Sequence, residues 1–201
     1  MTATQKQKSN LRGEKRRQLI LDALHDCVIK KGYAKTTLAD IAEAADMYPS
    51  HLLYYYNGKE AVLHHFFQNV SERIATRISD LSSESPREQI RLIADLFFAG
   101  ASISKSEIGF MLECFGVAVG DKVLRREKSE MDQQCKAYFT ELFKQTPGGL
   151  IPSSADAAEV AYANLIGLRS AVYFDDKLSL HEAHRLFLSS MLAIAGLLPE
   201  R

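Results

Sequence analysis

Across residues 36–60, the spacing of hydrophobic positions predicts two short helices with a tight turn between them. Leu38, Ile41, Ala42 and Ala45 recur at intervals of three and four residues, so they lie on one face of the first helix. Two short helices joined by a tight turn form a helix-turn-helix. The pattern is also typical of an ordinary helical hairpin, and the spacing alone does not separate the two.

The second short helix is expected to begin at Pro49, because proline is favoured at the first position of a helix. Leu52 and Tyr56 share one face, which is interpreted as the buried side. Hydroxyl and imidazole groups on the opposite face suit contact with DNA better than contact with solvent alone. We expect this outward face to contain Ser50, His51, Tyr54 and Tyr55.

The ends of both short helices carry recognisable capping residues. Thr37 stands at the expected N-cap of the first helix, and Asp40 three residues later completes a weak form of the capping box. Asp46 lies in the turn, and aspartate tolerates a left-handed backbone better than most residues. Tyr48 occupies the N-cap of the second helix, where a small polar residue is preferred, so we expect Pro49 to compensate for a poor cap.

Periodic patterns in the rest of the chain predict an all-α protein. The sequence contains only 5 prolines, no tryptophan and few runs of valine or threonine. A helix over residues 14–31 is expected to support the two short helices, with Gly32 just beyond its end. A long loop is expected over residues 145–154. Further helices are predicted over residues 59–81, 87–103, 106–119, 121–144, 155–174 and 180–198.

The distribution of charge is more informative than its total. The 25 basic and 25 acidic residues cancel, which by itself argues against a nucleic-acid partner. Residues 1–17, however, contain a single acid, Glu14, and a basic arm that can reach phosphates or a minor groove. We expect its first ten residues to be disordered in the free protein. The basic residues of this arm are Lys6, Lys8, Arg12, Lys15, Arg16 and Arg17.

Several classes of function find no support in the sequence. No catalytic constellation, cofactor motif or metal site is recognisable, so we expect a protein that is not an enzyme and needs no cofactor. His181 and His184 have a spacing found in metal sites, but no third ligand accompanies them. The three cysteines are far apart and are interpreted as reduced thiols. No signal peptide or membrane-spanning segment is evident, and we expect a cytoplasmic protein.

Three segments resemble the DNA-binding region of the tetracycline-repressor (TetR) family. These are residues 36–42 (TTLADIA), 52–56 (LLYYY) and 59–63 (KEAVL). The resemblance implies about nine helices, with a three-helix helix-turn-helix domain in residues 1–58. It implies a helical bundle for ligand binding and dimerisation in residues 59–201. It also implies a homodimer that binds a palindromic operator in double-stranded DNA and responds to a small-molecule effector.

The resemblance also assigns DNA contacts residue by residue. Base-reading positions fall on Tyr48, Pro49, Ser50, His51 and Leu53, and phosphate-contacting positions fall on Thr37, Tyr54, Tyr55 and Lys59. Leu53 departs from the family pattern, in which a tyrosine is common at that position. A leucine loses one polar contact there but can touch a thymine methyl group.

The last two predicted helices are candidates for a dimer interface. Arg169 is the only charged residue between positions 160 and 174, and a helix that is apolar nearly all round is buried on more than one face. Two such helices and their symmetry mates would form a four-helix interface. The alternative is that both belong to the core of one bundle. The predicted interface residues are Ala161, Leu165, Leu168, Val172, Phe187, Met191 and Ile194.

Aromatic and soft side chains in the middle helices are candidates for a ligand pocket. Glu113 and Arg169 are the charged residues expected to orient a ligand. An aromatic stripe at helical spacing is also typical of an ordinary core, and this alternative stays open. The predicted lining is Phe97, Phe98, Phe110, Met111, Cys114, Phe115, Tyr138, Tyr162, Ile166 and Arg169.

Together these features predict a ligand-responsive transcriptional regulator that acts as a repressor. The alternative is a helical enzyme or small-molecule carrier that uses the C-terminal half for chemistry or transport. The sequence does not identify the effector, the operator or the regulated genes, and it does not distinguish a repressor from an activator.

Overall fold

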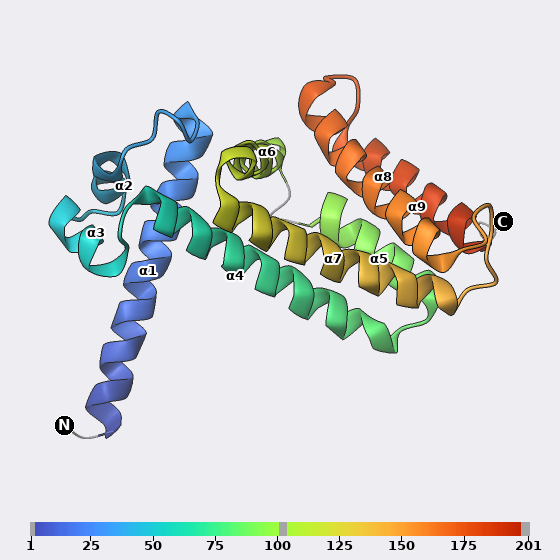
Figure 1. Cartoon of the computed structure of the whole chain (residues 1–201), viewed down its shortest axis with the longest axis horizontal. Helices are drawn as coiled ribbons and strands as arrows, with labels where there is room; N and C mark the ends of the chain where they lie inside the picture. Colours follow the sequence, from blue (N-terminus) through green and yellow to red (C-terminus); the bar gives the residue numbers. More distant parts are fainter. Residues whose placement is uncertain (1–2, 101–103, 198–201) are drawn as a thin grey trace. The chain divides into compact units, whose positions relative to one another are not determined.

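The computed structural model describes residues 3–100 and 104–197, with side chains from Arg12 onward. Within these ranges the chain forms nine α-helices, one short 3-10 helix and no strand, which confirms the all-α fold (Figure 1). The helices are α1 (Ala3–Lys31), α2 (Leu38–Ala44), α3 (Pro49–Tyr55), α4 (Lys59–Asp80), η1 (Leu81–Ser83), α5 (Pro86–Phe98), α6 (Lys105–Gly120), α7 (Lys122–Lys144), α8 (Ser154–Phe174) and α9 (Leu180–Ala195).

Helix α1 begins much earlier than the sequence predicts. The expected start was Glu14 with a disordered leader, whereas the helix already includes Ala3. Alanine, glutamine, lysine and arginine, which are good helix formers, dominate residues 3–13, and these contain no proline. No apolar periodicity marks this extension, so the periodicity argument had no signal to detect.

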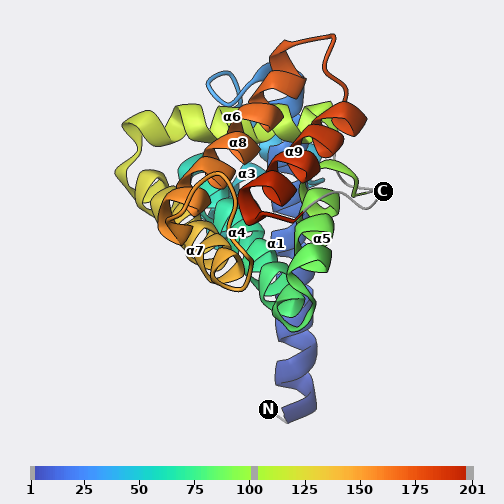
Figure 2. The ribbon, with the colours of Figure 1, turned by 90° about the vertical axis from the view of Figure 1, so that its right-hand side faces the viewer.

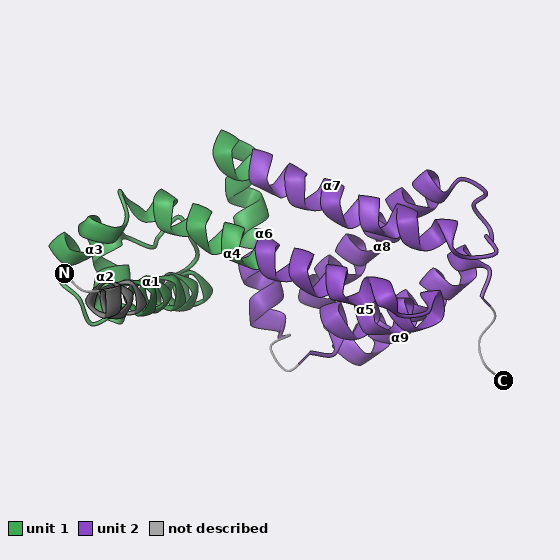
Figure 3. Ribbon diagram, turned by 90° about the horizontal axis from the view of Figure 1, so that it is seen from below, with its two compact units in different colours: residues 1–70, 113–125 green, residues 71–112, 126–201 purple. Residues whose placement is uncertain are grey.

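The chain divides into two compact units (Figure 3). Unit 1 comprises residues 1–70 and 113–125, and unit 2 comprises residues 71–112 and 126–201. The predicted division at residue 58 lies near this one but differs from it in two respects. The first half of α4 stays with the N-terminal helices, and the end of α6 joins them from much later in the sequence.

Unit 1 is organised around a small apolar core beneath the two short helices. Leu24 of α1, Ile41 of α2, Leu52 of α3 and Val62 of α4 are each fully buried. Complete burial of an aliphatic side chain contributes about 1.5–3 kcal/mol. One residue from each of the four helices therefore fixes the position of the helix-turn-helix on its support.

Unit 2 is a helical bundle in which α9 packs against both α5 and α8 (Figures 1 and 2). Its core includes the fully buried residues Ile90, Ile93, Leu142 and Phe187. Ser85, Ser153 and Ser179 cap α5, α8 and α9, each accepting a hydrogen bond from a backbone N–H three residues later. No helix in the described ranges is both long and apolar enough to span a bilayer.

The dimer residues predicted from sequence are largely core residues of unit 2. Six of the seven are less than 9% exposed, and the seventh, Leu168, is partly buried against the same core. Because most of their surface is already covered within one chain, these residues offer little area to a second copy, and their place in a dimer interface stays a prediction. The six buried residues are Ala161, Leu165, Val172, Phe187, Met191 and Ile194.

Candidate nucleic-acid interface

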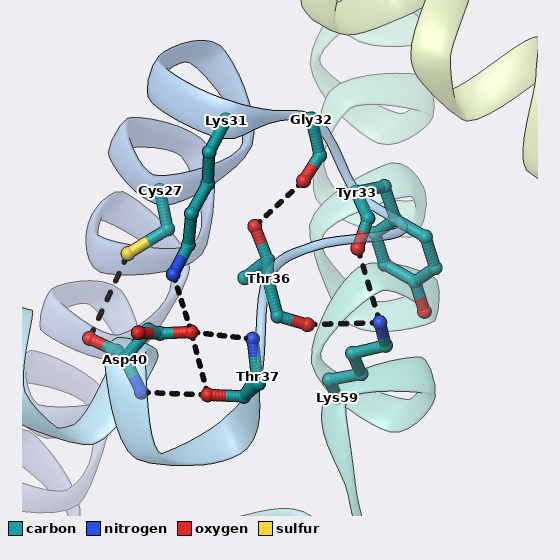
Figure 4. Close-up of polar contacts among 8 residues, drawn as sticks. All are labelled: Cys27, Lys31, Gly32, Tyr33, Thr36, Thr37, Asp40 and Lys59. Atoms are coloured by element: carbon teal, nitrogen blue, oxygen red, sulfur yellow. Dashed lines mark hydrogen bonds and ion pairs between the residues drawn. The ribbon is translucent and has the colours of Figure 1, made fainter.

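The start of α2 is fixed by a reciprocal pair of hydrogen bonds (Figure 4). The Thr37 hydroxyl accepts from Asp40 N at 3.2 Å, and Thr37 N donates to Asp40 Oδ2 at 2.7 Å. The Thr37 hydroxyl also donates to that carboxylate at 2.5 Å, and Lys31 Nζ lies 2.6 Å from it. The capping box is therefore confirmed, and the Lys31 ammonium and the Thr37 hydrogen bonds hold the Asp40 pKa well below its usual range.

The turn between α2 and α3 adopts the expected left-handed conformation at Asp46. Its φ of 52° is the only positive φ at a non-glycine residue in the described part of the chain. Met47 N donates to Ala42 O at 2.9 Å across the turn, which closes the last turn of α2. Asp46 therefore supplies the left-handed residue that this turn requires.

Helix α3 has a buried underside, as predicted. Leu52 is 0% exposed and Tyr56, at the end of the helix, is 7% exposed. Burial raises the pKa of Tyr56 to about 12, and its hydroxyl lies 2.5 Å from His65 Nδ1. Tyr48 makes no side-chain cap, and Pro49 opens the helix, as the sequence indicates.

The opposite side of α3 is exposed. Tyr48, Leu53 and Tyr54 are 74%, 52% and 85% exposed, and Pro49, Ser50 and His51 are exposed beside them. The Tyr48 and His51 rings meet edge to face, with centroids 5.8 Å apart. A convex helix face with hydroxyl, imidazole and apolar groups matches what direct readout of base edges in a major groove requires.

Helix α1 extends this exposed face with positive charge. Arg12, Lys15, Arg16 and Arg17 are all exposed, and the Arg17 guanidinium lies 5.8 Å from the centre of the Tyr55 ring. This contact places Arg17 of α1 beside α3. Exposed basic side chains at such a position can contact phosphates.

Two of the residues predicted to contact phosphate have other partners (Figure 4). Both hydrogen-bond donors of Thr37 are directed at Asp40. Lys59 Nζ donates to Tyr33 O at 3.0 Å and to Thr36 O at 2.9 Å, and it lies 4.3 Å from the centre of the Tyr33 ring. Lys59 therefore ties the α1–α2 loop to the start of α4. Nothing in the spacing of the sequence indicates this role.

The end of α6 and the start of α7 support the same loop and helix in unit 1. The Glu113 carboxylate accepts a hydrogen bond from Tyr33 N at 3.1 Å, and the Asp121 carboxylate lies 2.8 Å from His64 Nε2. Glu113 was predicted to orient a ligand. The structure shows it supporting the α1–α2 loop, 80 residues away in sequence, and its ligand-orienting role stays a prediction.

The residues predicted to line a ligand pocket are distributed over both units, and their common role stays a prediction. Cys114 and Phe115 belong to unit 1, whereas Phe97, Phe98 and Tyr162 are core residues of unit 2. Arg169 is 8% exposed and donates to Phe97 O at 2.9 Å. Burial lowers the pKa of Arg169, and Glu107 opposes this shift.

A groove does occur in unit 2, between the second half of α4 and the face of α7 opposite it. Its volume is about 640 Å³, within the range of small-molecule sites. Of the predicted lining, only Tyr138 contributes to it. The groove is lined by Ser71, Ile74, Ala75, Ile78, Ser79, Ser82, Met131, Gln134, Cys135, Ala137, Tyr138, Thr140 and Glu141.

Two family models match the chain. Residues 20–66 match the bacterial regulatory proteins of the tetR family, and residues 86–192 match the C-terminal region of BetI-type transcriptional repressors. The second match covers more than half of the chain. This protein therefore belongs to the TetR family of transcriptional regulators, with its helix-turn-helix DNA-binding domain in unit 1.

The individual relatives and solved structures share low sequence identity with this chain or match only part of it. The probable HTH-type transcriptional regulator YttP of Bacillus subtilis (strain 168) is 32% identical over 72 residues, which span 33% of this chain and 35% of that protein. A TetR transcription regulator from Haloarcula marismortui shares the fold with a TM-score of 0.78 at 18% identity, over 90% of this chain and 98% of the other. A putative regulator from Saccharomonospora viridis, solved in complex with choline, has a TM-score of 0.78 at 14% identity, over 89% and 96%.

Proposed function

We propose that this protein is a repressor that binds a palindromic operator in double-stranded DNA as a homodimer and leaves it when a small molecule binds unit 2. One observation carries the DNA-binding part. One face of α3 is buried through Leu52 and Tyr56. The buried face holds the helix in place, so the polar and aromatic groups on its opposite, exposed face are fixed in position for contact with DNA. The match to BetI-type repressors supports repression over activation.

Within this proposal, the N-terminal end of α3 reads the bases, through Tyr48, Pro49, Ser50, His51 and Leu53. Tyr54 and Tyr55 contact phosphates together with the basic residues of α1. Two of the three N–H donors of Lys59 bind carbonyl oxygens, and the third is available to contact a phosphate. Thr37 acts indirectly: its hydrogen bonds to Asp40 fix the start of α2, and it does not contact a phosphate.

The homodimer is supported by the outward faces of α8 and α9. Val160, Phe174 and Leu186 are 46%, 73% and 38% exposed, and Ala163 and Gly167 are exposed between them. A side chain added at Gly167 would meet no atom within 4 Å, so this surface leaves room for a second helix. An apolar surface with small residues is typical of a self-complementary two-fold interface.

The effector part of the proposal is supported by the groove in unit 2 and by the choline bound to the regulator from Saccharomonospora viridis. An effector releases DNA only if it binds the non-operator state more tightly than the operator state. Typical coupling free energies of about 1–3 kcal/mol would weaken operator binding about 5–150-fold.

The test is a pair of substitutions on the exposed face of α3. His51→Ala is expected to change which duplex is preferred, because it removes a base-reading group. Tyr54→Phe is expected to weaken all duplexes about equally, because it removes only a phosphate contact. Fluorescence anisotropy with an operator duplex and single-base variants measures both effects.

His181→Ala is the matched control, because it removes another exposed histidine, from α9. It should leave both the affinity and the sequence preference unchanged. If His51→Ala leaves the preference among duplexes unchanged while it still binds DNA, the assignment of base reading to this end of α3 is wrong.

A further inference from the structure

The groove in unit 2 is formed by one face of each of two helices. Its wall on α4 uses Ser71, Ile74, Ala75 and Ile78, which recur at helical spacing and continue toward Ser82. Its wall on α7 spans residues 131–141 with the same periodicity. Serine, alanine and threonine make up about half of the lining, and such small side chains leave space between the helices that larger ones would fill.

The charge on these walls is low. Glu141 is the only acidic or basic residue of the lining, and its carboxylate is exposed and lies 2.7 Å from Lys144 Nζ. Burial, with the Asp132 charge, raises the pKa of Cys135 to about 11, and burial raises that of Tyr138 to about 12. Both groups are therefore neutral near pH 7.

The lining argues against two common classes of ligand. It contains no lysine or arginine, so a carboxylate or phosphate would lose its water without gaining a counter-charge. It contains one aromatic ring, Tyr138, whereas quaternary ammonium groups are held by cages of several rings. The Tyr138 hydroxyl already donates to Gln89 Oε1 at 2.6 Å.

We propose that this groove binds an uncharged, largely apolar small molecule and not a quaternary ammonium compound. The apolar walls supply most of the binding free energy, and Gln134, Thr140 and the serine hydroxyls supply a few hydrogen bonds. The regulatory meaning of this site rests on the proposed function. A ligand here contacts the second half of α4. This helix begins at Lys59, whose ammonium group donates hydrogen bonds to two carbonyl oxygens of the α1–α2 loop.

The proposal is tested on the full chain without DNA, so its outcome does not depend on whether the protein is a repressor. Phenylnaphthylamine and anilinonaphthalene sulfonate are suitable fluorescent probes, because they share a ring skeleton and differ by one sulfonate. The neutral probe is expected to bind at least about tenfold more tightly, since the sulfonate must be desolvated without a cation. Choline in millimolar excess should not displace it.

The location is tested by filling the groove with Ala137→Trp, from an exposed position on its wall. Gln133→Trp is the matched control, because residue 133 is exposed on the same helix but outside the lining. Ala137→Trp should lower the affinity for the neutral probe at least about tenfold, because the indole occupies the space of the probe. Gln133→Trp should leave this affinity unchanged. Ser79→Phe on the opposite wall repeats the test if Ala137→Trp does not fold.

A charge substitution tests the charge preference of the groove separately from the space available in it. Glu141→Lys is expected to strengthen binding of the sulfonate probe and to leave the neutral probe within about twofold. Equal affinity of the native protein for both probes would overturn the neutral class of ligand. Displacement by choline, or unchanged binding in both groove-filling variants, would overturn the proposal as well.

Discussion

Replacement of Lys59 by methionine separates its structural role from a role in DNA binding. Methionine keeps most of the apolar stem but removes the ammonium group that binds Tyr33 O and Thr36 O. Thr36 is 1% exposed and Tyr33 is 8% exposed, so water does not easily replace the lost donor. The contact of the ammonium group with the Tyr33 ring is lost as well.

The expected cost follows from these contacts. A hydrogen bond that involves a charged group contributes about 1.5–3 kcal/mol, and the partly exposed position of Lys59 favours the lower end for each of its two bonds. We therefore expect Lys59→Met to lower the free energy of unfolding by about 2–4 kcal/mol, whereas loss of an ordinary surface lysine costs about 0–0.5 kcal/mol.

Urea unfolding followed by far-ultraviolet circular dichroism suits this measurement, because the chain is helical and contains no tryptophan. Lys35→Met is the matched control, since Lys35 is an exposed lysine of the same loop. DNA affinity is measured in parallel over a range of salt concentrations, where each phosphate contact contributes about 0.9 to the slope of log affinity against log salt. The structural role is refuted if Lys59→Met unfolds like Lys35→Met while the salt slope falls by about one.

Three further outcomes are expected. The folded-state pKa of Asp40 is depressed, so the stability that Asp40 contributes is present above its ordinary value of 3.8 and is lost as the pH falls below it. The urea midpoint of Asp40→Asn should therefore lie below that of the native protein at pH 7 and approach it at pH 3, and a gap that is constant with pH would contradict this. Asp46→Gly should stabilise the protein by up to about 1 kcal/mol because it relieves a left-handed residue, and a lowered urea midpoint would contradict that. Gly167→Leu should leave the circular dichroism spectrum unchanged and yield monomers in sedimentation velocity, whereas an intact dimer would place the interface elsewhere.

Local features of the helix-turn-helix could be predicted from the sequence because their causes lie within a few residues. Thr37 and Asp40 cap α2 through neighbouring atoms, and Asp46 adopts the conformation that its side chain tolerates. The inward positions of Leu52 and Tyr56 follow from helical spacing alone. Such patterns need no knowledge of distant segments.

The features that the sequence did not predict depend on distant partners. Periodicity correctly indicated that Phe187 and Met191 are buried, but it could not distinguish a core of one chain from an interface between two. The partners of Lys59 lie 23 and 26 residues away, and that of Glu113 lies 80 residues away. Aromatic stripes likewise indicated core positions, whereas the groove lies where small residues such as Ala75 and Ala137 leave space.

The most direct test of the central claim is a nuclease footprint of the purified protein on DNA upstream of its own gene at physiological salt. A two-fold symmetric dimer with an exposed recognition helix in each copy predicts one protected segment with two-fold sequence symmetry. Its half-site centres should be separated by about 10 base pairs or a multiple of this spacing. The absence of protection above that on random DNA, or protection of a single asymmetric half-site, would contradict the account.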